Sequence, residues 1–129
     1  MEARDGRLVL PLTAGLAAVS VPLSGAGPLL MRETALLGGP VIAVPGRPPR
    51  AWILAEADGL VVASADLPPG VVFHSPPSLA VLPPSELPRG PVRWLRAPVP
   101  ARRWLPSAAA VLALLADNEA NRAGPHPAA

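Results

Sequence analysis

The 129-residue chain contains no cysteine, no lysine and no tyrosine, and its aromatic residues are three tryptophans and one phenylalanine. Without cysteine it forms no disulfide bond and has no thiolate to act as a nucleophile or ligand, which is typical of a protein of the reducing cytoplasm. Its two histidines are too few to build a zinc site without several carboxylates. The sequence therefore predicts a cytoplasmic protein without a resident cofactor.

Reactive side chains are also scarce. Charged residues make up 16% of the chain, against about 25% in a typical domain. The serines that lie near His74 in the sequence, Ser75, Ser78 and Ser85, fall in proline-bounded turns, where serine is common for backbone reasons. The chain has neither a Gly-x-Ser-x-Gly elbow nor a glycine-rich phosphate loop. We therefore predict that it is not a self-sufficient enzyme.

All eleven basic residues are arginine, and the formal net charge is +2. Together with the abundance of alanine, proline and glycine, this favours a coding bias over a surface selected for nucleic acid. Each guanidinium can bind two phosphate oxygens at once, but so small a net charge does not by itself indicate a nucleic-acid partner. Composition alone therefore leaves the partner open.

The chain is rich in hydrophobic residues and in proline. Half of its residues are hydrophobic, and the 20 prolines and 11 glycines predict short strands joined by turns. The segment Leu8–Met31 carries no charge, but its prolines and glycines would interrupt a membrane-spanning helix repeatedly, and we expect no membrane partner. The length fits one domain, expected over residues 1–123, with a flexible proline-rich tail at 124–129.

Hydrophobic periodicity and turn residues predict two helices and a series of short strands. The helices cover Pro28–Leu37 and Ala108–Asn121, with Ser107 as the N-cap of the second. The predicted extended segments are Leu8–Leu12, Ala17–Leu23, Pro40–Val44, Ala51–Ala55, Leu60–Ala63, Val71–His74, Leu79–Leu82 and Val92–Leu95. The predicted fold class is α+β, a small mixed or antiparallel sheet of about five to seven short strands with two helices.

One pair of carboxylates lies at a predicted strand end. Glu56 and Asp58 are two residues apart, so an extended backbone would direct both to the same face, a geometry that suits a shared divalent metal. With His74 they are the candidate catalytic residues, and an active site of this kind would need Mg²⁺ or Mn²⁺. Asp66 is the nearest third carboxylate but has no matching context. A solvated turn after the strand is the simpler interpretation of the pair, and we prefer it.

Arginine and tryptophan alternate toward the C-terminal third. Arginine bound to phosphate, with tryptophan stacked on a base, is a sound combination for single-stranded nucleic acid. Core packing of the tryptophans, with the arginines as their exposed neighbours, is the competing interpretation. The candidate nucleic-acid-binding residues are Arg89, Arg93, Trp94, Arg96, Arg102 and Arg103.

The stretch Leu79–Ser85 (LAVLPPS), followed by Gly90 and Arg93-Trp94, resembles a segment of bacterial bifunctional DNA primase/polymerase (prim-pol) N-terminal domains. In that family a strand ends in a Pro-Pro-Ser turn, and a glycine leads into a strand that carries an aromatic residue. The similarity extends over about residues 15–115, through a Val-x-Val-Pro segment, a helix, a Gly-Pro-Val segment and a hydrophobic strand.

The resemblance implies a prim-pol-like scaffold but not the activity of the family. The family's active site uses an Asp-x-Asp pair on a strand, a histidine motif and a further aspartate. This chain has no Asp-x-Asp; the nearest substitutes are Glu56, Asp58 and His74, and a third carboxylate has no equivalent. The implied protein is a short, degenerate, catalytically inactive member.

Three functional hypotheses follow. The first is an inactive prim-pol-like domain that retains weak affinity for single-stranded nucleic acid. The second is a small cytoplasmic interaction or accessory protein that binds a protein partner and has no nucleic-acid role. The third, an active metal-dependent nucleotidyl transferase, requires Glu56, Asp58 and His74 to converge in one cleft.

Overall fold

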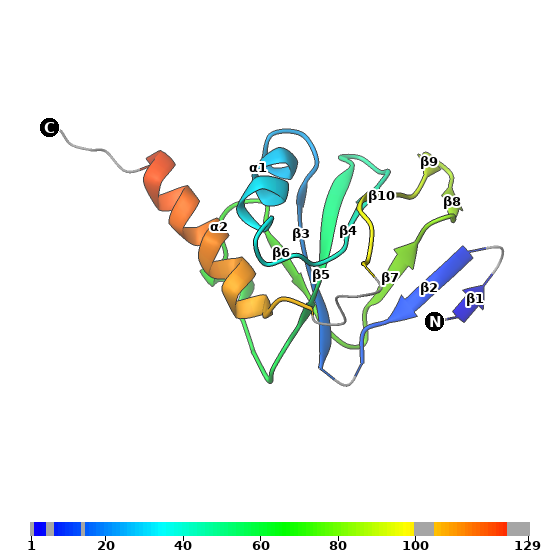
Figure 1. Cartoon of the computed structure of the whole chain (residues 1–129), viewed down its shortest axis with the longest axis horizontal. Coiled ribbons are helices and arrows are strands. Elements are labelled where there is room, and N and C mark those ends of the chain that lie inside the picture. The colour runs from blue at the N-terminus through cyan, green and yellow to red at the C-terminus, as the bar shows by residue number, and fades with distance from the viewer. Residues whose placement is uncertain (1, 5–6, 14, 100–104, 124–129) are drawn as a thin grey trace, which may run out of the picture.

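The computed structural model of the chain describes residues 2–4, 7–13, 15–99 and 105–123. Within them lie ten strands, one short 3-10 turn and two α-helices (Figure 1). The strands are β1 (Glu2–Arg4), β2 (Arg7–Pro11), β3 (Leu16–Pro22), β4 (Val41–Val44), β5 (Arg50–Glu56), β6 (Val72–His74), β7 (Leu79–Leu82), β8 (Glu86–Leu87), β9 (Gly90–Pro91) and β10 (Arg93–Arg96). The helices are α1 (Ala26–Glu33) and α2 (Ala108–Ala123), and the 3-10 turn covers Ser64–Asp66.

The strands form three antiparallel sheets. A five-stranded sheet has the order β10-β4-β5-β3-β6, a three-stranded sheet has the order β1-β2-β7, and β8 pairs with β9. This confirms an α+β fold with two helices and a sheet of five strands. The sequence pattern did not reveal that the remaining strands form separate sheets.

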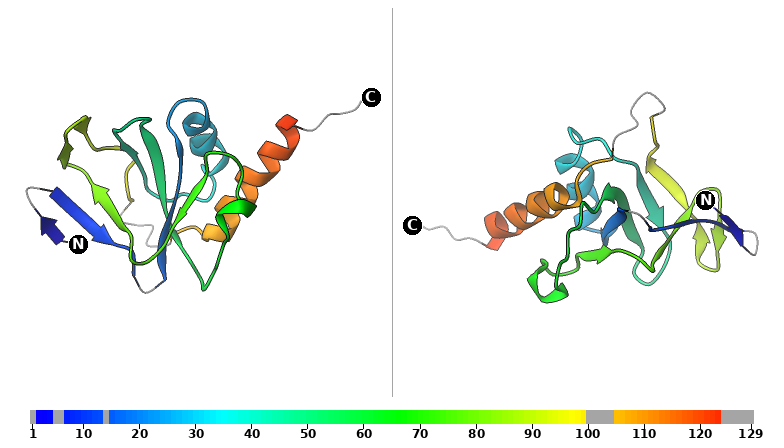
Figure 2. Two further views of the ribbon diagram at one scale, coloured as in Figure 1. Left: turned by 180° about the vertical axis from the view of Figure 1, so that it is seen from behind. Right: turned by 90° about the horizontal axis from the view of Figure 1, so that it is seen from below.

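Two chain segments pass through both larger sheets. β2 pairs with β7 in the three-stranded sheet, and their continuations β3 and β6 pair in the five-stranded sheet. At the bend between them, the Leu12 amide donates to the Ser78 carbonyl over 3.0 Å. One antiparallel ribbon therefore turns a corner and belongs to both sheets (Figure 2), as happens where strands switch sheets in orthogonal packing.

The five-stranded sheet separates two hydrophobic cores. Alternate residues of its strands, such as Val19 and Ile53, pack with α1 and α2 in a first core. Residues of the opposite face, such as Ala18 and Ile42, pack against the three-stranded sheet in a second. The layers are therefore helices, a sheet of five strands and a sheet of three (Figures 1 and 2).

The helices lie close to their predicted positions. α2 begins at Ala108 after Ser107, whose hydroxyl accepts a hydrogen bond from the Ala110 amide at 3.4 Å, which confirms the predicted N-cap. α1 starts two residues before and ends four residues before the predicted Pro28–Leu37. The Thr34 hydroxyl donates to the Leu30 carbonyl at 2.6 Å and helps to end the helix there.

Gly39 lies where the chain leaves α1 for β4 and approaches the side chains of Pro106 and Ile53 closely. It has φ +51°, and a Cβ built on it would be 2.8 Å from Pro106 Cγ and 3.0 Å from Ile53 Cδ1. Only glycine fits such a contact without displacement of a neighbour. Gly38 and Gly39 follow the end of α1, and the lack of a side chain at Gly39 lets this connection pack against the first core.

One local prediction was wrong, and one strand was not predicted. Leu60–Ala63 is a short apolar run like those of the strands, but it forms no strand. Leu60 and Val62 pack against the first core, while Val61 is 92% exposed. Glu2–Arg4 pairs with β2 as β1, a strand that the sequence pattern did not predict. The predicted tail at 124–129 lies outside the described residues.

The uncharged segment from Leu8 to Met31 forms β2, β3 and most of α1. In the part of the chain that the structure describes, neither helix is both long and apolar enough to span a membrane.

Candidate nucleic-acid interface

Charge is segregated along the strands of the five-stranded sheet. β5 begins with Arg50 and ends with Glu56, which at about 3.3 Å per residue places the two roughly 20 Å apart. Asp58 follows Glu56 in the exposed turn beyond the strand. One end of the sheet thus carries arginine and the opposite end carries carboxylates.

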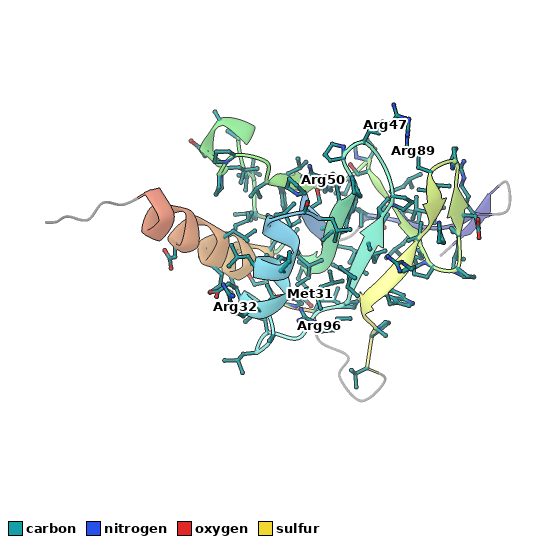
Figure 3. All side chains as sticks on the ribbon, turned by 90° about the horizontal axis from the view of Figure 1, so that it is seen from above. Met31, Arg32, Arg47, Arg50, Arg89 and Arg96 are labelled. Atoms are coloured by element: carbon teal, nitrogen blue, oxygen red, sulfur yellow. The ribbon has the colours of Figure 1, made fainter. Side chains whose placement is uncertain are left out.

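The arginine-bearing end gathers side chains from three separate segments, and we call Arg47, Arg50, Arg89 and Arg93 the basic end. Arg47 lies in the β4–β5 loop, and Arg89 lies in the β8–β9 turn. These turns touch, since a Cβ built on Gly90 would be 3.8 Å from Pro45 Cβ. Figure 3 shows Arg47 and Arg89 at the same edge of the molecule, with Arg50 deeper in it.

Arg93 completes this end. It is the first residue of β10 and lies opposite Ala43, next to the β4–β5 loop. Arg47, Arg89 and Arg93 are exposed, and within the described ranges no carboxylate lies at ion-pair distance from them. The acidic residue nearest to Arg89 in the sequence is Glu86, which is exposed at the start of β8. Three exposed guanidinium groups are therefore available to an anion here.

Arg50 is held more tightly than the other three. Its Nε donates to Ser20 Oγ at 3.0 Å, and its Nη2 donates to the Ser20 carbonyl at 3.1 Å and to the Gly70 carbonyl at 2.6 Å. Burial lowers the pKa of this half-buried guanidinium from its usual value. Arg50 therefore ties β5 to β3 and to the loop that leads into β6.

The Ser20 hydroxyl connects Arg50 to His74. Ser20 Oγ and His74 Nε2 are 2.8 Å apart. Arg50 Nε donates to the same oxygen, so one serine hydroxyl links the histidine ring to the guanidinium. Burial and, secondly, the positive charge of Arg50 lower the pKa of His74 from 6.5 to about 4. His74 is therefore neutral at pH 7.

Ser20 and His74 are as close as a catalytic nucleophile and its base, but a substrate cannot reach the serine hydroxyl. Ser20 is fully buried, with an exposed fraction of 0%, so no substrate carbonyl or phosphorus can approach its oxygen. His74 also lies flat against Trp52, with ring centroids 3.8 Å apart and planes inclined by 14°. The cluster positions three strands against one another and offers no nucleophile.

The predicted catalytic residues do not meet. Glu56 and Asp58 are exposed, and Asp58 lies in a turn with φ +50°, so the extended geometry expected for this pair is not formed. His74 lies level with Leu54, two residues before Glu56 in β5, but its ring is bonded to Ser20 and stacked on Trp52. Asp66 is exposed in the 3-10 turn. Among the described residues, no three His, Asp or Glu side chains are placed to hold a metal ion.

The predicted nucleic-acid residues divide into two groups. Arg89 and Arg93 belong to the basic end. Trp94 is half-buried and packs in the second core. Arg96, whose pKa burial lowers from its usual value, donates to the Gly39 carbonyl at 2.8 Å, to the Met31 carbonyl at 3.3 Å and to Thr34 Oγ1 at 2.7 Å. Arg102 and Arg103 lie outside the described residues, so they stay predictions.

Sequence reasoning missed Arg47, Arg50 and Trp52 as members of this region. A weak signal was present, because Arg50 and Trp52 alternate at the start of β5 and must share a face of the sheet. The position of Arg47 beside Arg89 depends on the contact between two turns that are far apart in the chain. That contact has no local signature.

Comparisons with known proteins add no relative: no family model, no curated protein and no solved structure matches this chain.

Proposed function

We propose that this chain is a non-catalytic domain that binds single-stranded nucleic acid weakly through its basic end. The observation that carries the proposal is the collection of Arg47, Arg89 and Arg93 at one end of the sheet, opposite the carboxylates of Glu56 and Asp58. A polyanion is attracted to the first end and repelled by the second, so its approach is oriented although the net charge is only +2.

The residue type suits phosphate. Each planar guanidinium donates to two phosphate oxygens, and the exposed groups contribute attraction that does not depend on base sequence. Few contacts are available, so the affinity is low and falls steeply with salt. Lack of cysteine suits the reducing cytoplasm, where we place the protein.

A degenerate prim-pol-like scaffold is the origin that we propose for this fold. The Pro-Pro-Ser turn supports it, because Ser85 is buried and fixes the turn on β2: Ser85 Oγ accepts from the Leu8 amide at 2.7 Å and donates to the Leu8 carbonyl at 3.3 Å. Gly90, with φ +137°, then allows the return toward β10. The engagement of His74 by Ser20 and Trp52, rather than by Glu56 or Asp58, supports loss of nucleotidyl transfer, and Mg²⁺ or Mn²⁺ has no role in the proposal.

The test is the binding of a fluorescein-labelled oligothymidylate to the full chain, measured by anisotropy over a series of salt concentrations. For a single strand, the logarithm of the association constant falls with the logarithm of salt by about 0.7 per phosphate neutralised. The double variant Arg47→Ala/Arg89→Ala should reduce this slope by roughly 1.4 and weaken binding.

The matched control is Arg32→Ala, which removes an exposed arginine of α1 outside the basic end. It should leave the slope within error of the wild type. Absence of binding by the wild type at low salt would overturn the proposed function, and so would an equal loss in the Arg32 variant, since the effect would then report net charge alone.

A protein-interaction role is the second candidate, favoured by the position of β10 at the edge of the five-stranded sheet. An edge strand can accept a further strand from a partner. Replacement of the exposed Leu95 of β10 by proline would then abolish partner binding but leave oligothymidylate binding at the basic end unchanged.

A further inference from the structure

The face of the five-stranded sheet that carries Trp52 ends, at β6, in a half-buried aromatic ring, that of His74. Residues of β6 alternate between the two faces: Phe73 packs against the first core, whereas Val72 and His74 lie on the opposite face with Ser20 and Trp52. Val72 is 41% exposed and His74 is half-buried. The second core therefore does not extend over β6, which is the outermost strand of its sheet.

Two contacts of His74 occupy defined parts of its ring. Trp52 covers one face of the imidazole at a centroid distance of 3.8 Å. Ser20 occupies the Nε2 corner at 2.8 Å. Among the described residues, no stacked ring and no hydrogen bond is found on the outer face of the imidazole or at Nδ1.

We propose that the outer face of His74 is a stacking site for one base of the single-stranded nucleic acid whose phosphates contact the basic end. The inference rests on the proposed function and adds the position of a base to it. The Trp52–His74 pair forms two layers of a stack, and a base added to the outer face of His74 forms the third.

Geometry and charge favour a base over other occupants. His74 and Arg50 both contact Ser20 Oγ, at 2.8 and 3.0 Å, so the ring lies next to the most deeply held arginine of the basic end. β6 and β10 are the two edges of the sheet, so the ring and Arg93 are four strand spacings, about 19 Å, apart. An extended single strand of several nucleotides that crosses the sheet can therefore touch both. The neutral ring adds no attraction for phosphate, so it distinguishes a strand with bases from one without them. Every base has a π-face that can stack on it.

The test compares an oligothymidylate with an abasic oligomer that has the same number of phosphates. One stacked base should make wild-type binding of the oligothymidylate about 5- to 150-fold tighter than binding of the abasic oligomer. Two substitutions separate the ring from its hydrogen bond. His74→Phe keeps a flat ring and should retain the preference, whereas His74→Asn keeps a hydrogen-bonding group for Ser20 but has no ring and should lose it.

The slope of affinity against salt should be the same in the wild type and both variants, because the arginines are intact. Each variant is first shown to be folded by its thermal transition. A second measurement needs no variant: the ring protons of the histidine that titrates near pH 4 should shift upfield on addition of oligothymidylate but not of the abasic oligomer.

The outcomes distinguish the two proposals. Equal binding of both oligomers by the wild type, with a normal salt slope, would overturn the stacking site and leave the proposed function intact. Retention of the preference in His74→Asn would also overturn it. Failure of both oligomers to bind at low salt would instead overturn the function on which the stacking site depends.

Discussion

The rings of Trp52 and His74 stack across an intervening strand. Trp52 belongs to β5 and His74 to β6, and β3 runs between them. Contact over that strand is possible because the residues of β3 on this face, Ala18 and Ser20, are small and lie opposite His74 and Trp52. The stack therefore depends on the small size of Ala18 and Ser20.

This arrangement predicts that folding stability depends on pH through His74. Its pKa is about 4 in the folded protein and about 6.5 in the unfolded chain. Between these values the unfolded state binds more protons, so stability is greatest above pH 6.5 and is lost as the pH falls toward 4. Because the ring is half-exposed, we expect a loss of about 2 kcal/mol, measured by urea denaturation at pH 7 and pH 4.5.

The His74→Phe variant serves as the control, because carboxylates also titrate in acid. It should lose less stability than the wild type between the two pH values. An identical loss would assign the pH dependence to other groups.

The second prediction separates two arginines of β10. Arg96→Ala removes hydrogen bonds to the Met31 and Gly39 carbonyls and to Thr34, and should lower the free energy of unfolding by about 2 kcal/mol. Arg93→Ala removes an exposed side chain and should change it by less than about 0.5 kcal/mol. Denaturant midpoints of the two variants measure the difference.

Oligothymidylate binding should show the reverse order. Arg93→Ala should reduce the salt slope by about 0.7, and Arg96→Ala, at a temperature where it is folded, should leave it unchanged. Arg96 would count as a ligand of nucleic acid if both slopes fell equally.

The third prediction concerns two glycines with positive φ. Gly59→Ala (φ +73°, open space around the Cβ) should cost only the backbone strain of about 1 kcal/mol. Gly39→Ala adds a collision with Pro106 and Ile53, and should destabilise by roughly 2 kcal/mol more. Thermal denaturation of the pair provides the comparison, and equal losses would show that the connection can move away from Pro106.

Local sequence patterns were sufficient for most elements of the fold. The apolar run from Ala51 to Ala55, bounded by proline and by Asp58-Gly59, predicted β5 almost to the residue. Ser107 predicted the start of α2. These features are determined by neighbours along the chain. The prediction of a strand over Leu60–Ala63 failed because a short apolar run shows that side chains can be buried but does not supply a strand to pair with.

The candidate site was less accessible to sequence reasoning because it depends on register. The pairing of β3 with both β5 and β6 places Ser20 between Trp52 and His74, and no local pattern encodes a pairing over 54 residues. Arg96 is a similar case. Its sequence context is that of an exposed strand residue, but the bulge between Trp94 and Arg96 places it beside the carbonyls at the end of α1.

The corner turned by the β2–β3 and β6–β7 segments has a consequence for how the molecule unfolds. Each segment supplies one strand to the three-stranded sheet and the next to the five-stranded sheet. The two layers consequently share the same two chain segments and one continuous set of hydrogen bonds between them. A fragment that contained only one sheet would therefore break strands that continue into the other sheet. The layers are parts of one cooperative unit, in which opening of either sheet frees the end of the other.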